Sequence, residues 1–284
     1  MYYFFVKRKK GPKPSAFVPW DMFMKSIICT LKEKNIDIEI ISDSGKITKG
    51  DTVIFFIFDD VKSIENINAK FIGINTEGFF SKIIDPPHHV RIENKIKNIK
   101  TSQIWDYTWK NIESNLFKNH IYVPPGYSKI YEDEFEIEKD LDIVFYGSMN
   151  NRRSKILDKI SRVIKPKKLS IIETTQHNHI KMIKRAKIVI DIHYYDDDKP
   201  IDYYRISPLL SNKVFVIHED VQKEDKKSEA YKHLSKSIIF SSYDDFANVC
   251  KKWIDVSQEE RDNVSEKTYK IFKNEFGLEK FIKV

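Results

Sequence analysis

Basic and small residues crowd one short stretch in the middle of the chain, DIVFYGSMNNRRSKILDKI. An apolar strand pattern runs into Gly147 and Ser148, and a helical pattern begins after Asn150. Arg152 and Arg153 fall in the first turn of that helix, where the helix dipole is already positive. Backbone N–H groups at such a terminus bind phosphate, and guanidinium groups neutralise it with directed hydrogen bonds. The stretch therefore predicts an anion site, with a surface turn and solvated arginines as the alternative.

Polar side chains also gather at the ends of two apolar strand patterns in residues 188–220. The first pattern ends at His193 and runs into two tyrosines and three aspartates, and the second ends near Glu219. Arg205 opens an apolar helix between them, and a buried arginine needs a partner, which is Asp202 or a ligand phosphate. Taken singly, these residues fit a structural histidine and a solvated acidic loop. Their position at two strand ends predicts a ligand site.

The elements that would position these residues alternate along the chain between apolar strand patterns and helical patterns. In the first half we expect strands at 2–6, 36–41, 52–58, 70–75, 102–107 and 120–125, and helices at 20–34, 79–84 and 109–117. In the second half we expect strands at 142–147, 168–174, 187–194, 214–219 and 237–242, and helices at 151–163, 177–186, 203–211 and through most of 243–284. This alternation predicts an α/β fold with parallel sheets covered on both faces.

The length of 284 residues exceeds one small core and predicts two domains. An acidic polar stretch, KIYEDEFEIEKD, separates the two alternating units and is the expected linker. The expected parts are an N-terminal domain at 1–128, the linker at 129–140, a C-terminal domain at 141–255 and a helical tail at 256–284. For the tail, packing back on the N-terminal domain is one option. We expect two Rossmann-like, doubly wound domains that face a central cleft at the carboxyl ends of their strands.

The composition favours a globular protein and argues against a disulfide-rich or membrane-spanning one. Hydrophobic residues make up 41% of the chain, which is enough for a globular core. The net charge of +7 suits nucleotides, nucleic acid or an anionic membrane surface, although dispersed lysines also serve solubility alone. Cys29 and Cys250 are far apart, which argues against a disulfide framework and a cysteine zinc site. The start does not read as a secretion signal and no apolar run is long enough for a membrane span, so we expect a soluble, cytoplasmic protein.

Six stretches of the sequence carry a resemblance to a known family. In the second half they are DIVFYGSMNNRRSKIL, HIKMIKRAKIVIDIHYY and DYYRISPLLSNKVFVIHED, and in the first half FIGINTEGF, IWDYTWKNIESNLF and IYVPPGYSKIY. Together they resemble GT-B fold glycosyltransferases, in particular the CgeB-type and "glycosyl transferases group 1" proteins. The likeness covers roughly residues 70–220. The G-x-G-x-x-G and G-x-x-x-x-G-K-[ST] phosphate motifs are absent.

The resemblance implies transfer of a sugar from a nucleoside-diphosphate sugar to a hydroxyl acceptor, with no cofactor and no bound metal. In such enzymes a helix N-terminus and basic side chains stabilise the leaving diphosphate. The implied diphosphate contacts are Gly147, Ser148, Asn150, Arg152, Arg153 and Arg205. The implied nucleotide or sugar contacts are Thr174, His193, Tyr194, Tyr195, Asp202, Ser207 and Glu219.

The chain departs from the family pattern at two of these places. Ser207 stands where many such enzymes have a glutamate that holds the ribose, and Asn212 stands where they have a glycine. The ribose contact would then be weaker, or Asp202 or Glu219 would make it. The E-x7-E spacing of retaining enzymes is absent between 195 and 219.

A general base must come from the first half if the reaction inverts the anomeric centre. Glu77 follows the strand FIGIN and is the first candidate, with an acid that only complements a helix dipole as the alternative. Asp106 is the second candidate and fits equally a cap for the helix at 109–117. The loop with Gly11 and Ser15 is implied to approach donor phosphate or acceptor, and a flexible basic loop is the alternative.

The sequence is also compatible with two other functions. A degenerate GT-B-like protein would bind a sugar nucleotide or glycan without turnover. The basic charge also allows a nucleic-acid-binding or DNA-modifying protein, although no recognition helix or RNA-binding motif is found. The donor, the acceptor, the stereochemical outcome and the oligomeric state are not determined by the sequence.

Overall fold

The computed structural model of the protein describes most of the chain, namely residues 1–7, 18–79, 87–172 and 179–283. Gly11, Ser15 and Thr174 lie outside the described residues. All but the first residue of the expected helix at 79–84 lies outside them as well. Predictions on these positions stay predictions.

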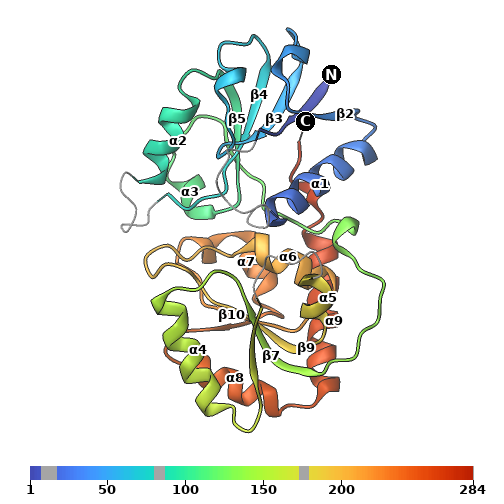
Figure 1. Ribbon diagram of the computed structural model, residues 1–284, viewed down its shortest axis with the longest axis vertical. Coiled ribbons are helices and arrows are strands. Elements are labelled where there is room, and N and C mark those ends of the chain that lie inside the picture. The colour runs from blue at the N-terminus through green and yellow to red at the C-terminus, as the bar shows by residue number, and fades with distance from the viewer. Residues whose placement is uncertain (8–17, 80–86, 173–178, 284) are drawn as a thin grey trace.

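The N-terminal half is built on one parallel sheet with helices around it (Figure 1). Its described strands have the order β2-β1-β3-β4-β5-β6. They are β1 Tyr2–Phe5, β2 Ile38–Ile41, β3 Thr52–Phe56, β4 Lys70–Ile74, β5 Thr101–Asp106 and β6 His120–Tyr122. The helices are α1 Val18–Glu33, α2 His88–Ile96 and α3 Trp109–Glu113. Strand β3 is buried along its whole length, which is the pattern of a parallel strand covered on both faces.

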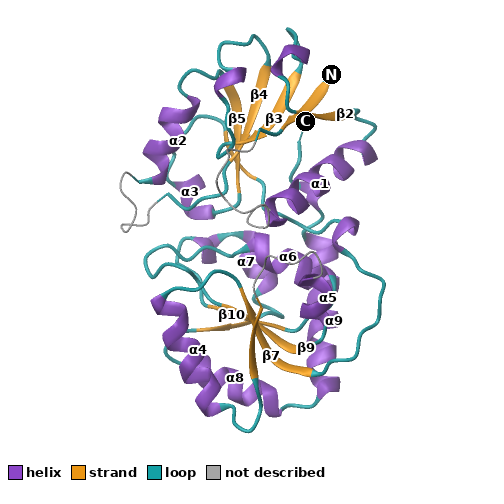
Figure 2. Cartoon of the chain, in the orientation of Figure 1, coloured by secondary structure: helices purple, strands orange, loops and turns teal. Residues whose placement is uncertain are grey.

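The C-terminal half repeats this plan with a second parallel sheet (Figure 2). Its described strands have the order β11-β10-β9-β7-β8. They are β7 Leu141–Tyr146, β8 Leu169–Ile172, β9 Ala186–Asp191, β10 Val216–Glu219 and β11 Ile239–Ser241. The helices are α4 Asn151–Val163, α5 His179–Lys184, α6 Tyr203–Ser211, α7 Glu229–Leu234, α8 Phe246–Asp255 and α9 Gln258–Glu275.

The order of the second sheet creates a switch point between β7 and β9. The chain leaves β7 toward β8 on one side and then returns to β9 on the other side. Connections that diverge in this way leave a crevice at the carboxyl ends of the two strands, where doubly wound proteins bind ligands. Gly147 follows β7 and His193 follows β9, so both lie at this crevice.

The expected architecture is confirmed, and the differences lie in short helices. The expected strands are all found, with ends that shift by at most three residues. Helices α2 and α7 were not expected, because each carries few apolar positions. Pro87 precedes α2 as its N-cap. Helix α3 stops before Asn115, which has a left-handed backbone with φ of 52°.

Two segments connect the halves, and both are anchored by buried side chains. Residues 129–131 form a 3-10 turn in which Tyr131 is buried, and the amide of Asn212 on α6 donates to the Tyr131 carbonyl. After α9 the chain returns to the N-terminal half, where both termini lie (Figure 1). There Leu278 and Ile282 are fully buried in the apolar cluster around α1 and β3.

Candidate active site

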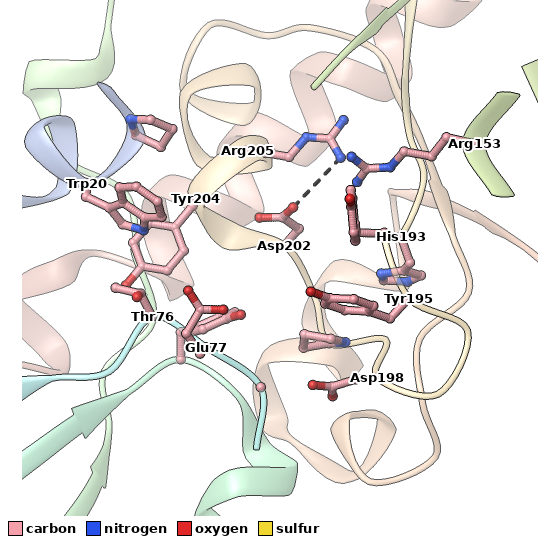
Figure 3. Close-up of a pocket in the computed structure, with 15 residues that line it drawn as sticks. Trp20, Thr76, Glu77, Arg153, His193, Tyr195, Asp198, Asp202, Tyr204 and Arg205 are labelled. Carbon is pink, nitrogen blue, oxygen red and sulfur yellow. Dashed lines mark ion pairs between the residues drawn. The ribbon is translucent and has the colours of Figure 1, made fainter. Parts of the chain in front are cut away.

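A cavity of about 260 Å³ lies between the two halves at the carboxyl ends of their strands (Figure 3). The N-terminal half contributes Pro19, Trp20, Thr76, Glu77, Gly78 and Tyr107. The C-terminal half contributes Arg153, His193, Tyr194, Tyr195, Asp198, Pro200, Asp202, Tyr204 and Arg205. The C-terminal half therefore contributes both arginines and two carboxylates to the cavity, and the N-terminal half contributes the carboxylate of Glu77.

Two guanidinium groups form the basic part of the cavity. Arg153 and Arg205 both lie against the ring of Phe145, with their central carbons 5.4 and 5.3 Å from its centroid. Figure 3 shows the two groups side by side. Gly147 packs on both, since a Cβ there would lie 3.4 Å from Nη1 of Arg153 and from Cζ of Arg205. Its φ of 138° is also one that other residues rarely adopt, so glycine is required twice over.

The two arginines repel each other, and only one of them has carboxylate partners. Burial and the neighbouring Arg205 lower the pKa of Arg153 to about 10, so it is still charged at neutral pH. Its hydrogen bonds go to the carbonyls of Ile192 and Ser148. Arg205 instead forms ion pairs with Asp191 and Asp202. An anion at this place would relieve the repulsion.

Arg152 points away from the cavity, which separates it from its neighbour. Its guanidinium donates to the Glu219 carboxylate and the His193 carbonyl, and it pairs with Asp196. Glu219 is almost fully buried and also accepts from the His193 backbone N–H. Neither residue lines the cavity. The geometry thus corrects their assignment as direct contacts, because each satisfies the other behind the strand ends.

His193 presents a neutral imidazole to the cavity. Burial and His218 hold its pKa well below the usual range. No described residue offers a hydrogen bond to its Nε2 atom, although the side chain is 6% exposed. His218 lies behind it, with ring centroids 5.3 Å apart, and pairs with Asp191 through Nε2 at 3.1 Å. His193 therefore has one buried hydrogen-bonding atom with no partner among the described residues.

Glu77 is the acidic group of the N-terminal half at the cavity. It follows β4, and Asn75 fixes its backbone by accepting from the Glu77 N–H and donating to the Glu77 carbonyl. Burial and the nearby Asp198 carboxylate raise the pKa of Glu77 to about 7. A carboxylate that exchanges its proton near neutral pH suits general base work.

Asp106 is near Glu77 in the fold but lies outside the cavity lining. It is 1% exposed and accepts hydrogen bonds from the side chains of Asn75 and Asn111 and from the Thr108 backbone N–H. His120 also contacts it at 2.9 Å. The cap of α3 is Thr108, not Asp106. Asp106 therefore orders the loops around Glu77, and a direct role at the reacting atoms does not fit its position.

Each of the remaining predicted site residues either lines the cavity or holds a neighbouring residue in place. Tyr194, Tyr195 and Asp202 line the cavity. Asn150 is the N-cap of α4, accepting from the Arg153 N–H, and it donates to the Tyr194 carbonyl. Ser148 is exposed and contributes its carbonyl to Arg153.

Ser207 is placed differently from the expectation. Its side chain is fully buried and donates to the Pro125 carbonyl, so it joins α6 to the end of the N-terminal half. Asn212 serves the same junction, accepting from the Asp133 N–H. Neither lies at the cavity, so the geometry contradicts a ribose contact by Ser207, since the side chain faces the domain junction.

Sequence interpretation missed several lining residues. Trp20 and Tyr107 come from the N-terminal half and Tyr204 from α6, with the rings of Tyr107 and Tyr204 5.1 Å apart. The sequence predicts a solvated loop for Asp198, yet this residue is 6% exposed. The signal for Asp198 was weak, because the three consecutive aspartates look alike and only tertiary contacts separate them.

Among the described residues, no group of three His, Cys, Asp or Glu side chains is arranged to hold a metal ion. No helix in the described part of the chain is long and apolar enough to cross a membrane.

Two parallel-stranded domains with a ligand crevice between them define the GT-B fold of glycosyltransferases, and comparisons with solved structures agree. S. aureus TarM, in complex with fondaparinux, alpha-GlcNAc-glycerol and UDP, has a TM-score of 0.60 at 10% identity over 81% of this chain and 53% of TarM. The pneumococcal O-GlcNAc transferase GtfA, with UDP and GlcNAc, has a TM-score of 0.56 at 12% identity over 94% of this chain and 58% of GtfA. The N-terminal domain of Candida albicans trehalose-6-phosphate phosphatase scores 0.52 at 9% identity, over 96% of this chain and 75% of that domain.

Sequence comparison adds one relative. An uncharacterized protein of Acanthamoeba polyphaga mimivirus is 28% identical over 165 residues, which is 57% of this chain and 54% of that protein. No family model matches the chain. The matched part is about half the length of that relative and of TarM. The resemblance to CgeB-type proteins stays a prediction.

Proposed function

We propose that the protein is a glycosyltransferase that moves a sugar from a nucleoside-diphosphate sugar to a hydroxyl group of an acceptor, without a bound metal. The observation that carries this proposal is the pair of guanidinium groups, Arg153 and Arg205, at the switch point of the C-terminal sheet. Glu77 faces the same cavity from the N-terminal domain.

The arginine pair would stabilise the leaving diphosphate. Charge builds on that group as the glycosidic bond to it breaks, and fixed cations in a site shielded from water are most effective there. Each guanidinium has more N–H donors than its present hydrogen bonds use, and Nε of Arg205 has no hydrogen-bond partner among the described residues. Asp191 and Phe145 hold the pair in place before substrate arrives.

Glu77 would act on the acceptor. With a pKa of about 7 it is partly ionised at neutral pH and can accept the proton of the attacking hydroxyl. Trp20 and Tyr204 lie near it in the cavity wall (Figure 3), and Tyr107 lines the same cavity. Their faces suit the apolar face of a sugar ring, so a glycan acceptor is the first choice.

The size of the cavity implies that the domains separate to admit the donor. Ligand sites of this kind commonly have about 300–1,000 Å³, and the cavity of about 260 Å³ is smaller than that. Closure around the donor would then exclude water and limit hydrolysis.

A non-catalytic sugar-nucleotide binding protein is the second candidate. Ser207 and Glu219, two of the residues considered for the ribose, are both occupied by contacts within the protein, and Asp202 is the ribose candidate that lines the cavity. Nucleic-acid or membrane contact through the basic surface stays a prediction without a specific site.

The first experiment measures nucleotide binding. Because TarM and GtfA were solved with UDP, UDP is the first probe, followed by the diphosphates of guanosine, adenosine and thymidine and their sugar conjugates. By calorimetry we expect Arg153→Gln to raise the Kd of the bound diphosphate about 10- to 100-fold, since one charged donor is lost. Arg162→Gln is the matched control, because Arg162 is exposed on the same helix and lies away from the cavity.

The second experiment separates transfer from binding. Release of the diphosphate from its sugar conjugate, with and without glycan acceptors, is followed by chromatography in excess EDTA. Diphosphate release that requires Glu77 and survives EDTA supports a metal-independent transferase. Tight binding with no release under any condition points to the binding protein, and equal affinity of Arg153→Gln and the unmodified protein would overturn the site.

A further inference from the structure

The two domains meet at the acidic end of the cavity through one unusually close approach. Asp198, in the loop between β9 and α6, lies directly on the backbone of Gly78, which follows β4. A Cβ on Gly78 would lie 1.6 Å from Oδ2 of Asp198, and its three nearest atoms all belong to that side chain. Gly78 is not among the glycines with positive φ. Glycine is therefore needed at position 78 because a side chain would displace the Asp198 carboxylate, and not because the backbone has a positive φ.

This contact places a second carboxylate beside Glu77, the residue that precedes Gly78 in the chain. Asp198 is 6% exposed, so little water screens it. The Lys110 ammonium of α3 is its ion-pair partner, at a distance of 3.9 Å from Oδ1, which leaves much of the negative charge to act on Glu77. Among the described residues, the charged and titratable groups that face these two carboxylates are Arg91 of α2, Lys110 of α3, Asp106 of β5, Asp197 of the same loop, Asp225, and Tyr107, Tyr195 and Tyr204.

We propose that Asp198 is a positioning residue that makes Glu77 a stronger base. The C-terminal domain brings Asp198 against Gly78 when the domains close, and the negative charge of Asp198 then holds the proton on Glu77. This inference rests on the proposed function only in calling Glu77 the base. The electrostatic link between the two carboxylates can be tested without any substrate.

The order in which the two groups ionise supports this role. Burial and Asp197 raise the pKa of Asp198 to about 6, against the opposing effect of Lys110, whereas burial and Asp198 raise that of Glu77 to about 7. Asp198 therefore loses its proton first, and Glu77 meets its charge throughout the neutral range. Two interacting carboxylates in one site separate their ionisations in this manner.

Opening of the domains would lower the pKa of Glu77 again. Asp198 belongs to the C-terminal domain and Glu77 to the N-terminal domain, so separation removes the like charge and rehydrates both groups. Glu77 is then an ordinary, weak base in the open protein. Its basicity at neutral pH belongs to the closed cleft, in which an acceptor hydroxyl is protected from water.

The test is a titration of Glu77 in the full-length protein, followed by NMR with 13C-labelled glutamate and assigned through the signal lost in Glu77→Gln. We expect the midpoint to fall by about one pH unit in Asp198→Asn, because a like charge is removed. Asp197→Asn, which makes the same charge change one residue away, should leave the midpoint of Glu77 in place. Gly78→Ala gives a second route, since its methyl group must displace Asp198 without removing any charge, and the midpoint should fall again.

An unchanged midpoint in both Asp198→Asn and Gly78→Ala overturns the inference, as does an equal fall in Asp197→Asn. The outcome does not depend on finding a substrate, so it is separate from failure of the proposed function. If transfer is detected, the acid limb of the rate profile of Asp198→Asn should move to lower pH by the same amount as the NMR midpoint. A loss of rate at every pH with no movement of that limb would indicate only a structural role.

Discussion

Glu77 and Asp106 are carboxylates at the ends of neighbouring strands, yet their surroundings assign them different work. Asp106 accepts several hydrogen bonds, from Asn75, Thr108 and Asn111 among others, and these fix it as a structural group. Glu77 instead lies at the cavity, where burial and a like charge keep its proton in place up to about pH 7. The residue type alone does not distinguish the two, because the difference is made by what each carboxylate touches.

Replacement of Glu77 by glutamine tests its role as a base. We expect sugar transfer to fall about a hundred- to ten-thousand-fold, since the proton acceptor is lost while size and hydrogen bonding are nearly kept. The Kd for UDP should stay within about twofold, because the arginine pair proposed to bind the diphosphate is separate from Glu77 in the cavity lining. In the unmodified protein the rate should rise with pH around 7, as Glu77 ionises. A glutamine variant with normal turnover would remove Glu77 from the mechanism.

The Glu77→Gln substitution should also change how the free energy of unfolding depends on pH. The pKa of Glu77 in the folded chain, about 7, is above its usual value of 4.5, so the folded state holds this proton more tightly than the unfolded state. The stability it contributes is fully present below about pH 4.5 and is lost as pH rises to about 7. Denaturant unfolding at several pH values should show this decline in the unmodified protein relative to Glu77→Gln.

At the scale of elements, the junction between β7 and α4 sets the geometry of the basic site. Gly147 turns the chain with a φ of 138°, and Asn150 caps α4 through the Arg153 N–H. The cap fixes the direction of the helix, and adjacent residues on a helix point about 100° apart. Arg153 consequently lines the cavity and Arg152 turns to Glu219.

Loss of the cap tests the importance of this junction. Asn150→Ala should lower the free energy of unfolding by about 1 kcal/mol, and the Kd for UDP should rise, because the first turn of α4 carries Arg153. Asn150→Asp keeps the capping oxygen and loses only the donor to the Tyr194 carbonyl, so most of the stability should remain. Equal stability of the alanine variant and the unmodified protein in urea would show that the cap is unimportant.

At the scale of the whole molecule, the end of the chain belongs to the core of the opposite domain. After α9 the backbone bridges to the N-terminal half, where the Tyr127 N–H donates to the Phe276 carbonyl at 2.7 Å. Leu278 and Ile282 then fill the apolar cluster beside α1, and Lys34 donates to the Ile282 carbonyl at 2.6 Å. The N-terminal core is therefore completed by residues at the far end of the sequence.

Truncation of Leu278 measures this contribution. Leu278→Ala should cost about 2–5 kcal/mol of unfolding free energy, because the fully buried side chain leaves a cavity. Lys283→Ala, five positions later and exposed, should change it by no more than about 0.5 kcal/mol. If both variants unfold at the same urea concentration as the unmodified protein, the C-terminal segment is not part of the folded core.

The sequence by itself determined the two alternating units, the strands and the strand ends at which the cavity lies. Those features depend on local periodicity and on the rule that parallel strands present their carboxyl ends together, as at Gly147 and His193. Only the tertiary structure decided which side chains share the cavity. It separated Arg153 from Arg152 and Glu77 from Asp106, and it brought Asp198 from an apparently solvated loop onto Gly78. Such choices depend on contacts between residues far apart in the chain, and burial and charge at those contacts leave no periodic trace in the sequence.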